Sequence, residues 1–333
     1  MSWFVFSVIC LLGWGFADLF YKKGTDDEDR YSHLKIAVWV GLIMGATSVI
    51  LLLFHMSETE MTFSGLMKNA LSYAPASLCY IISMIIGYAG LRYLELSIVS
   101  PIQNASGALS AICMLVFFLA TGRFTDFTDA FSTLDIIGTI LIVIGVIALA
   151  IVENKLSRKS ADASSASAQS ADSGSSDRRY RFGTLALLFP LLYCLFDTIG
   201  TAADGIILDE EKGLGLGEMD VIILYGLTFL LVGLGCWLYI LIRSHKPYNP
   251  FRRSEGFKFV AACCEEFGQV FYVFAMARKP VIAAPMVASY CIVSVILSRI
   301  FVKERLRASQ YACVISVIIG IVILGISEGI ASM

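Results

Sequence analysis

Two adjacent glutamates, Glu265 and Glu266, lie in the middle of a long apolar stretch, with no Lys, Arg or His within one helical turn. A charged side chain at the centre of a bilayer costs about 2.5–3.5 kcal/mol even on insertion scales, so it normally faces a cavity and has a function. Because desolvation and mutual repulsion disfavour neighbouring charges, we expect at least one of the pair to be protonated. A helix places Glu265, Gln269 and Tyr272 on one polar face, at i, i+4 and i+7. This pattern predicts that Glu265 attracts a cationic solute or, with Glu266, carries a coupling proton; the alternative is structural hydrogen bonding between helices.

Two aspartates repeat this pattern in other apolar stretches, each with aromatic or hydroxyl side chains on the same helical face. The two sets are Trp14, Asp18 and Tyr21, and Tyr193, Asp197 and Thr201. Each aspartate comes late in the first apolar segment of its half of the chain, as expected if the two segments contribute equivalent groups to one cavity. The alternative is that each lies at the membrane interface, with Asp18 close to Lys22 and Asp197 close to Asp204.

These residues lie in ten predicted membrane-spanning segments. The chain has 333 residues, of which 57% are hydrophobic and 16% charged, whereas soluble domains have about 25% charged residues. A spanning helix needs roughly 20 apolar residues, and the mean hydropathy of +0.77 fits a chain built largely of such segments. The ten segments are 2–21, 33–55, 68–91, 98–120, 134–153, 182–203, 219–243, 257–276, 282–302 and 309–330. The sequence therefore predicts an all-α integral membrane protein, with the lipid bilayer as its surroundings.

Composition and motifs exclude several other classes of protein. The formal net charge of −2 argues against nucleic acid as a partner, because a phosphate backbone calls for a dense basic face. Neither a phosphate-binding loop of the Walker type nor a convergent cluster of catalytic or metal-ligating side chains occurs, so we predict no enzyme activity, metal site or cofactor. The predicted function is secondary active transport of a small molecule; the alternatives are a membrane-embedded enzyme and a non-transporting receptor or scaffold.

A Ser- and Ala-rich stretch, residues 154–180, divides the chain and is predicted to be a disordered linker. It leaves two parts of equal length, 1–153 and 181–333, with five predicted spans each. An odd number of spans makes the second part enter the membrane in the opposite sense, which predicts inverted repeats with a substrate site near the midplane. Shifting one half by 184 residues places Ile98, Pro101 and Ser110 over Ile282, Pro285 and Ser294.

The charges in the loops predict the orientation of the chain. Of the 25 Lys and Arg residues, 19 fall on one side of the predicted membrane and five on the other, with Arg299 inside a span. Because short cytoplasmic loops are enriched in Lys and Arg, we expect a multi-pass protein of the plasma (inner) membrane, with its central linker in the cytoplasm and both termini outside.

Four segments carry a resemblance to a known family: Gly13–Asp18 with its Trp-Gly pair, Gly90–Pro101, Ala275–Pro285 and Val302–Leu306. In these segments and in its two sets of five spans, the chain resembles the ten-helix EamA-like members of the drug/metabolite transporter superfamily. The resemblance implies a carrier working by alternating access, its cavity lined by the first, third and fourth helices of each half. It thereby adds Gln103, Asn104, Ser289 and Tyr290 to the candidate site. One departure is the segment Thr121–Phe124, which stands where the family's repeat usually ends in a Glu-Arg pair.

The candidate site combines aromatic rings with carboxyl groups, a combination that suits a cationic or zwitterionic organic solute. Since the central carboxyl pair belongs to the second half, we expect the solute to lie nearer Glu265 than the axis between the halves. In the last span, Gly325 and Gly329 form a GxxxG pair that permits close helix approach. This pair predicts either a homodimer seam or packing within one chain.

Overall fold

The computed structural model describes residues 1–26, 28–59, 63–94, 96–124, 131–168, 188–244, 248–302 and 307–332. In these ranges the chain forms helices and no strands. Ten helical segments are long and apolar enough to cross a membrane, which confirms the predicted all-α fold with ten spans. Seven spans are formed by α1 (Trp3–Gly24), α2 (Ser32–Thr59), α3 (Phe63–Gly90), α7 (Thr133–Ala168), α10 (Leu188–Ile207), α11 (Glu218–Ser244) and α15 (Ala308–Ala331). The other three spans each combine two or three helices. The fourth span is α4 (Leu96–Asn104) with α5 (Ser106–Ala120), and the eighth is η1 (Arg253–Glu255) with α12 (Gly256–Met276). The ninth is α13 (Pro280–Ala288) with α14 (Tyr290–Leu297) and η2 (Ser298–Val302).

The fourth and ninth spans are each broken at one residue, Ala105 between α4 and α5 and Ser289 between α13 and α14. Pro101 and Pro285 lie inside the helices, four residues before the breaks. A proline within a helix removes one backbone hydrogen bond and crowds the preceding turn, so it weakens the helix at this point. The two breaks are 184 residues apart, which is the same shift that aligns the two prolines.

The structure differs from the prediction at the start of the linker. Residues 154–168, expected to be disordered, continue α7 as helix to Ala168. Ala, Lys and Arg are frequent in this stretch and favour helix, whereas the prediction rested on its Ser-rich composition. Residues 169–180 of the predicted linker, and residues 303–306 of the predicted Glu-Arg helix end, lie outside the described residues.

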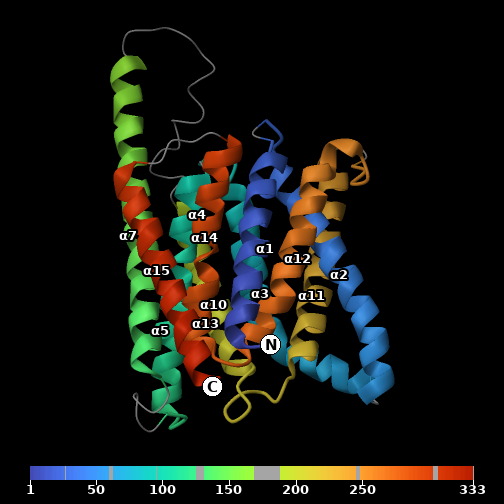
Figure 1. The fold of residues 1–333 in the computed structure, drawn as a ribbon. Helices are drawn as coiled ribbons and strands as arrows, with labels where there is room; N and C mark the ends of the chain where they lie inside the picture. The colour runs from blue at the N-terminus through green and yellow to red at the C-terminus, as the bar shows by residue number, and fades with distance from the viewer. Residues whose placement is uncertain are drawn as a thin grey trace.

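Helices of one half pair with helices of the other. The packed pairs are α1 with α12, α3 with α10, α2 with α11, and α7 with α15. Figure 1 shows both termini at one end of the bundle, while the extension of α7 projects from the opposite end. We call the first end the terminal face and the second the linker face.

The broken span α13–α14 lies at the centre of the bundle, and α7 and α15 lie at its edge. In the most apolar window of each span, 89% of the residues of α13–α14 are buried, against 28% of those of α15. Small residues bring α7 and α15 together, since a Cβ atom on Gly138 would lie 3.0 Å from the carbonyl oxygen of Gly320. Of the predicted GxxxG pair, Gly325 packs against the ring of Phe4 in the same chain, and Gly329 borders open space.

Candidate functional site

A small cavity lies between the two halves and is lined by residues of α1, α3, α4, α10, α12 and α14. Its volume is about 30 Å³, room for one or two water molecules. Seven of the predicted site residues line it: Trp14, Asp18, Tyr21, Gln103, Tyr193, Glu265 and Tyr290. Lining residues that the sequence did not single out are Tyr80, Met84, Gly87, Tyr88 and Leu91, all on α3 or directly after it. The family resemblance named the third helix of each half as cavity-lining, and this was the one signal for these residues.

Asp18 connects the two halves within this cavity. Its Oδ2 atom accepts hydrogen bonds from the hydroxyl groups of Ser100 on α4, at 2.7 Å, and Ser294 on α14, at 2.8 Å. The nearby Lys22 ammonium donates to the carbonyl oxygens of Leu91 and Leu94, at 2.6 and 3.1 Å. Asp18 therefore lies among hydroxyl groups of both halves and lines the cavity.

Glu265 faces the same cavity from α12. Its side chain is 7% exposed, and its backbone carbonyl accepts a hydrogen bond of 3.3 Å from the indole of Trp14. The next members of its helical face, Gln269 and Tyr272, are buried one and two turns further along. Neither amide atom of Gln269 has a hydrogen-bond partner among the described residues. Glu266 points away from the cavity, toward Thr47 on α2.

Asp197 is buried next to the cavity but does not line it. Its Oδ2 atom accepts a hydrogen bond of 2.5 Å from Ser106, the first residue of α5, and its Oδ1 atom has no partner among the described residues. Asn104 and Ser289 lie at the helix breaks, where they donate to the carbonyl oxygens of Ser100 and Met286. The structure thus places Asp197, Asn104 and Ser289 around the cavity and not in its lining.

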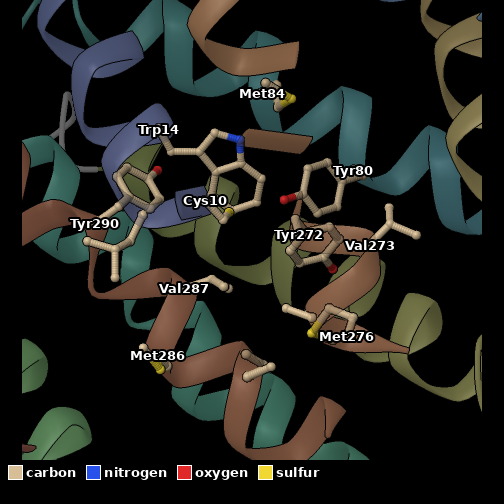
Figure 2. Close-up of a cluster of buried hydrophobic side chains, with 14 of the residues drawn as sticks. Cys10, Trp14, Tyr80, Met84, Tyr272, Val273, Met276, Met286, Val287 and Tyr290 are labelled. Atoms are coloured by element: carbon tan, nitrogen blue, oxygen red, sulfur yellow. The ribbon is translucent and has the colours of Figure 1, made fainter. Parts of the chain in front are cut away.

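Aromatic side chains from both halves line the cavity and close it on one side. The ring of Trp14 lies 5.2 Å from that of Tyr272 and 5.6 Å from that of Tyr290, and Figure 2 shows these rings together with Tyr80. Beyond them toward the terminal face, the side chains are almost fully buried and form an apolar layer. Its members are Cys10, Val273, Met276, Met286 and Val287.

In each half, an aromatic ring packs against a glycine of the other half. A Cβ atom on Gly268 of α12 would overlap the indole of Trp14, and one on Gly87 of α3 would lie 2.7 Å from the ring of Tyr193. Trp14 and Tyr193 stand four residues before Asp18 and Asp197, respectively. Each of the two first helices therefore presents an aromatic ring to a glycine of the other half and carries an aspartate four residues later.

Some ion pairs at the terminal face join the two halves, whereas Arg278 with Glu218, at 4.0 Å, and Lys279 with Glu328 lie within the second half. Arg123 of the first half pairs with Asp209, at 3.1 Å, and Glu211, at 2.9 Å, of the second. The ammonium of Lys279 lies 3.9 Å from carboxylate oxygens of both Asp135 and Glu328. Arg123 belongs to the segment that departs from the family pattern, and its pairing across the halves could not be deduced from that departure.

Among the described residues, the ion pairs at the linker face lie within one half. Lys35 pairs with Asp29 at 2.6 Å, and Lys258 pairs with Glu255 at 2.9 Å. Although partial burial acts in the opposite direction, Lys35 and the backbone N–H of Tyr31 hold the pKa of Asp29 below its usual value. Contacts between the halves at this face include cation–π contacts, with Lys23 over Phe301 and Lys35 over Tyr248. They also include stacked rings, Phe20 with Phe257 and Tyr93 with Phe189.

The comparisons with known proteins bear on the fold alone. No family model matches the sequence, and no curated protein sequence matches it. One solved structure, described only as "Crystal structure of protein", matches over 97% of this chain and 96% of its own, with a TM-score of 0.59 and 12% identical residues. The ten apolar helices indicate a multi-pass membrane protein.

Proposed function

We propose that this protein is a secondary carrier that moves a small organic cation by alternating access and binds it in the central cavity. The observation that carries the proposal is the chemistry of the cavity lining, in which two carboxyl groups and six aromatic rings face one another. Carboxylates pair with a cation directly, and aromatic faces attract it through their quadrupole. Among the described residues, the lining contains no Lys, Arg or His.

A zwitterionic solute is the second candidate, and Gln103 favours it. The Nε2 atom of Gln103 lines the cavity as a buried donor without a partner among the described residues. A buried donor without a partner destabilises a protein by about 1–3 kcal/mol. A solute carboxylate that accepts a hydrogen bond from Gln103 would remove this cost. Cation and zwitterion therefore differ in whether they require Gln103.

We propose that the two halves are inverted repeats, and three observations support this. The packed pair of α1 with α12 has its counterpart in α10 with α3. The breaks at Ala105 and Ser289 are related by the same shift as the prolines that precede them. Trp14 of the first half contacts Gly268 of the second, and Tyr193 of the second half contacts Gly87 of the first, so each half supplies one ring and one glycine. In such an arrangement either half can separate from the other on one side of the membrane at similar energy.

Transport requires the helices around the cavity to move apart, since about 30 Å³ is too small for an organic solute. The broken spans provide flexible points next to the site, because α4 and α14 both contact α1. We propose Glu265 as the coupling proton site. Its helical neighbour Glu266 faces α2 and does not line the cavity, which makes it a matched control.

The family and the orientation remain part of the proposal. The ten spans and the paired halves support membership of the EamA-like drug/metabolite transporters. The distribution of Lys and Arg supports a cytoplasmic linker face in the plasma (inner) membrane. Accessibility of tags at both termini from outside intact cells tests this orientation, and tags reached only after permeabilisation would overturn it.

Flux into liposomes tests the proposed function. The purified chain is reconstituted, a pH gradient is imposed, and uptake of small organic cations, zwitterions and anions is measured. We expect saturable, gradient-driven uptake of a cation or zwitterion that falls at least about tenfold in Asp18→Asn and Glu265→Gln, as expected for loss of a buried charge partner. Glu266→Gln should transport normally. Absence of flux across the whole panel, or anion transport that survives Glu265→Gln, would overturn the proposal.

A further inference from the structure

Asp204, near the end of α10, is a buried carboxyl group that does not line the central cavity. It is 2% exposed. Its Oδ1 atom accepts a hydrogen bond of 2.9 Å from the hydroxyl of Tyr73, and its Oδ2 atom accepts one of 3.3 Å from that of Tyr272. Tyr73 lies on α3 of the first half and Tyr272 on α12 of the second. Asp204 therefore links α10 by hydrogen bonds to α3 of the first half and to α12 of the second.

The groups that surround Asp204 carry no positive charge. From α3 and α12 it meets the two tyrosines, which are themselves buried, and on its own helix the nearest titratable group is Asp197, seven residues earlier. At the adjacent Gly205, α5 and α13 present Met114 and Pro280. In the part of the chain that the structure describes, Asp204 forms no ion pair with Lys, Arg or His. An ionised carboxyl group in such surroundings would lack a counter-ion, at a substantial cost in free energy.

A proton suits this site better than a metal cation. Mg²⁺ and Ca²⁺ take about six or more oxygen ligands, whereas both hydroxyl groups here already act as donors to the carboxyl group. A protonated carboxyl group keeps two hydrogen bonds, because it still accepts from Tyr73 and its own O–H donates to the hydroxyl oxygen of Tyr272. The geometry thus accommodates both protonation states.

Asp204 lies between the central cavity and the terminal face. On the cavity side, the ring of Tyr272 is 5.2 Å from that of Trp14 and 6.1 Å from that of Tyr80, and both of these rings line the cavity. On the other side, Asp209 follows five residues later and pairs with Arg123 at the terminal face. Asp197, whose Oδ1 atom has no hydrogen-bond partner among the described residues, is two helical turns from Asp204 toward the linker face.

We propose that Asp204 is a second proton-binding site, distinct from the cavity, which exchanges its proton with water from the terminal face and with the cavity. An O–H bond forms on the carboxyl group when a hydronium ion reaches it, and its charge falls from −1 to zero. The same bond breaks when the proton passes to water in the cavity. The existence of the site stands on its geometry alone, whereas its role in coupling rests on the proposed carrier function.

Infrared difference spectroscopy of the full chain in lipid tests the site without measuring transport. We expect a carboxylic acid C=O band that disappears as the pH is raised, and this band should be absent in Asp204→Asn. Asp209→Asn, which removes an acid at the terminal face, should leave the band unchanged. Tyr73→Phe keeps the carboxyl group and removes one donor, so it should shift the midpoint of the same band and keeps the test valid if Asp204→Asn does not fold. A spectrum unchanged by Asp204→Asn, or an unmoved midpoint in Tyr73→Phe, would overturn the proposal.

Transport measurements separate this inference from the proposed function. In liposomes, Asp204→Asn should bind the solute as the wild type does and move fewer protons for each solute transported. If the wild type moves no solute but the band titrates, the carrier proposal fails and the proton site stands. If the wild type couples to protons and Asp204→Asn has the same stoichiometry and spectrum, the proton site is disproved and the carrier stands.

Discussion

The terminal and linker faces are held together by different interactions. At the terminal face, the ion pairs of Arg123 and Lys279 join one half to the other, and an apolar layer fills the space beneath the cavity. At the linker face, the ion pairs of Lys35 and Lys258 stay within one half. Domains that separate must break the interactions between them and keep those within them. Because the described ion pairs that join the halves lie at the terminal face, we expect this face to resist opening more than the linker face.

The largest expected effect concerns the packing of the halves at the level of the cavity. Gly268→Ala introduces a methyl group into the space of the Trp14 indole, and overpacking of this kind costs about 1–3 kcal/mol. We expect a clear fall in Tm in detergent or lipid. Gly235→Ala is the matched control, because a Cβ atom there meets nothing within 4 Å. Equal Tm values for the two variants would contradict the close approach of the halves.

Breaking the Arg123 ion pairs should loosen the terminal face. In a background in which Cys10 is the one remaining cysteine, Arg123→Gln should speed its labelling by a thiol reagent, because Cys10 is fully buried in the apolar layer. Two exposed ion pairs contribute about 1 kcal/mol together, so we expect a rise of about fivefold. Lys35→Gln removes a pair at the linker face and should leave the rate unchanged. Equal labelling rates in both variants would remove the distinction between the faces.

Lys279→Gln should have a smaller effect on the same measurement. Its two carboxylate partners are 3.9 Å away, and the nearby hydrogen bond of 2.5 Å from Trp3 to Glu328 remains in the variant. We expect labelling of Cys10 to rise less than in Arg123→Gln, by about twofold. A larger rise than in Arg123→Gln would show that Lys279 is the main contact between the halves at this face.

The smallest expected effect is the pH dependence that Asp29 contributes at the linker face. The pKa of Asp29 is lower in the folded protein than its usual value. Its contribution to the free energy of unfolding is therefore fully present above the usual pKa, and it is lost as the pH falls through the folded pKa. Asp29→Asn should therefore lower stability near neutral pH by less than about 1 kcal/mol. The difference in Tm from the wild type should vanish in acid. A difference that persists in acid would show that Asp29 acts through packing.

The sequence predicted the elements of this fold better than their contacts. Apolar segments of spanning length identified all ten spans, because burial in a bilayer imposes that length directly on the sequence. Glu265, Gln269 and Tyr272 are all buried in α12, but of the three Glu265 alone lines the cavity. The helix breaks were less predictable, because a proline can lie at the start of a helix as well as inside it.

Contacts between distant residues could not be read from spacing. Nothing in the sequence indicates that Ser100 and Ser294 donate to Asp18, because the three residues come from α1, α4 and α14. Tyr80 and Tyr88 on α3 were likewise indistinguishable from packing residues until the helices were assembled. The helical extension of α7 was mispredicted because Ser-rich composition suggested disorder, while the Ala and Lys content of the same stretch favours helix.

The most direct test of the central claim is the charge that moves when a solute binds. In proteoliposomes on a solid-supported membrane, a jump in the concentration of the transported cation should produce a transient current in the wild type. The same current should appear in Glu266→Gln, whose side chain faces α2, and should be lost in Asp18→Asn, which removes a carboxylate from the cavity lining. An undiminished current in Asp18→Asn would contradict a cation-binding site between the two halves.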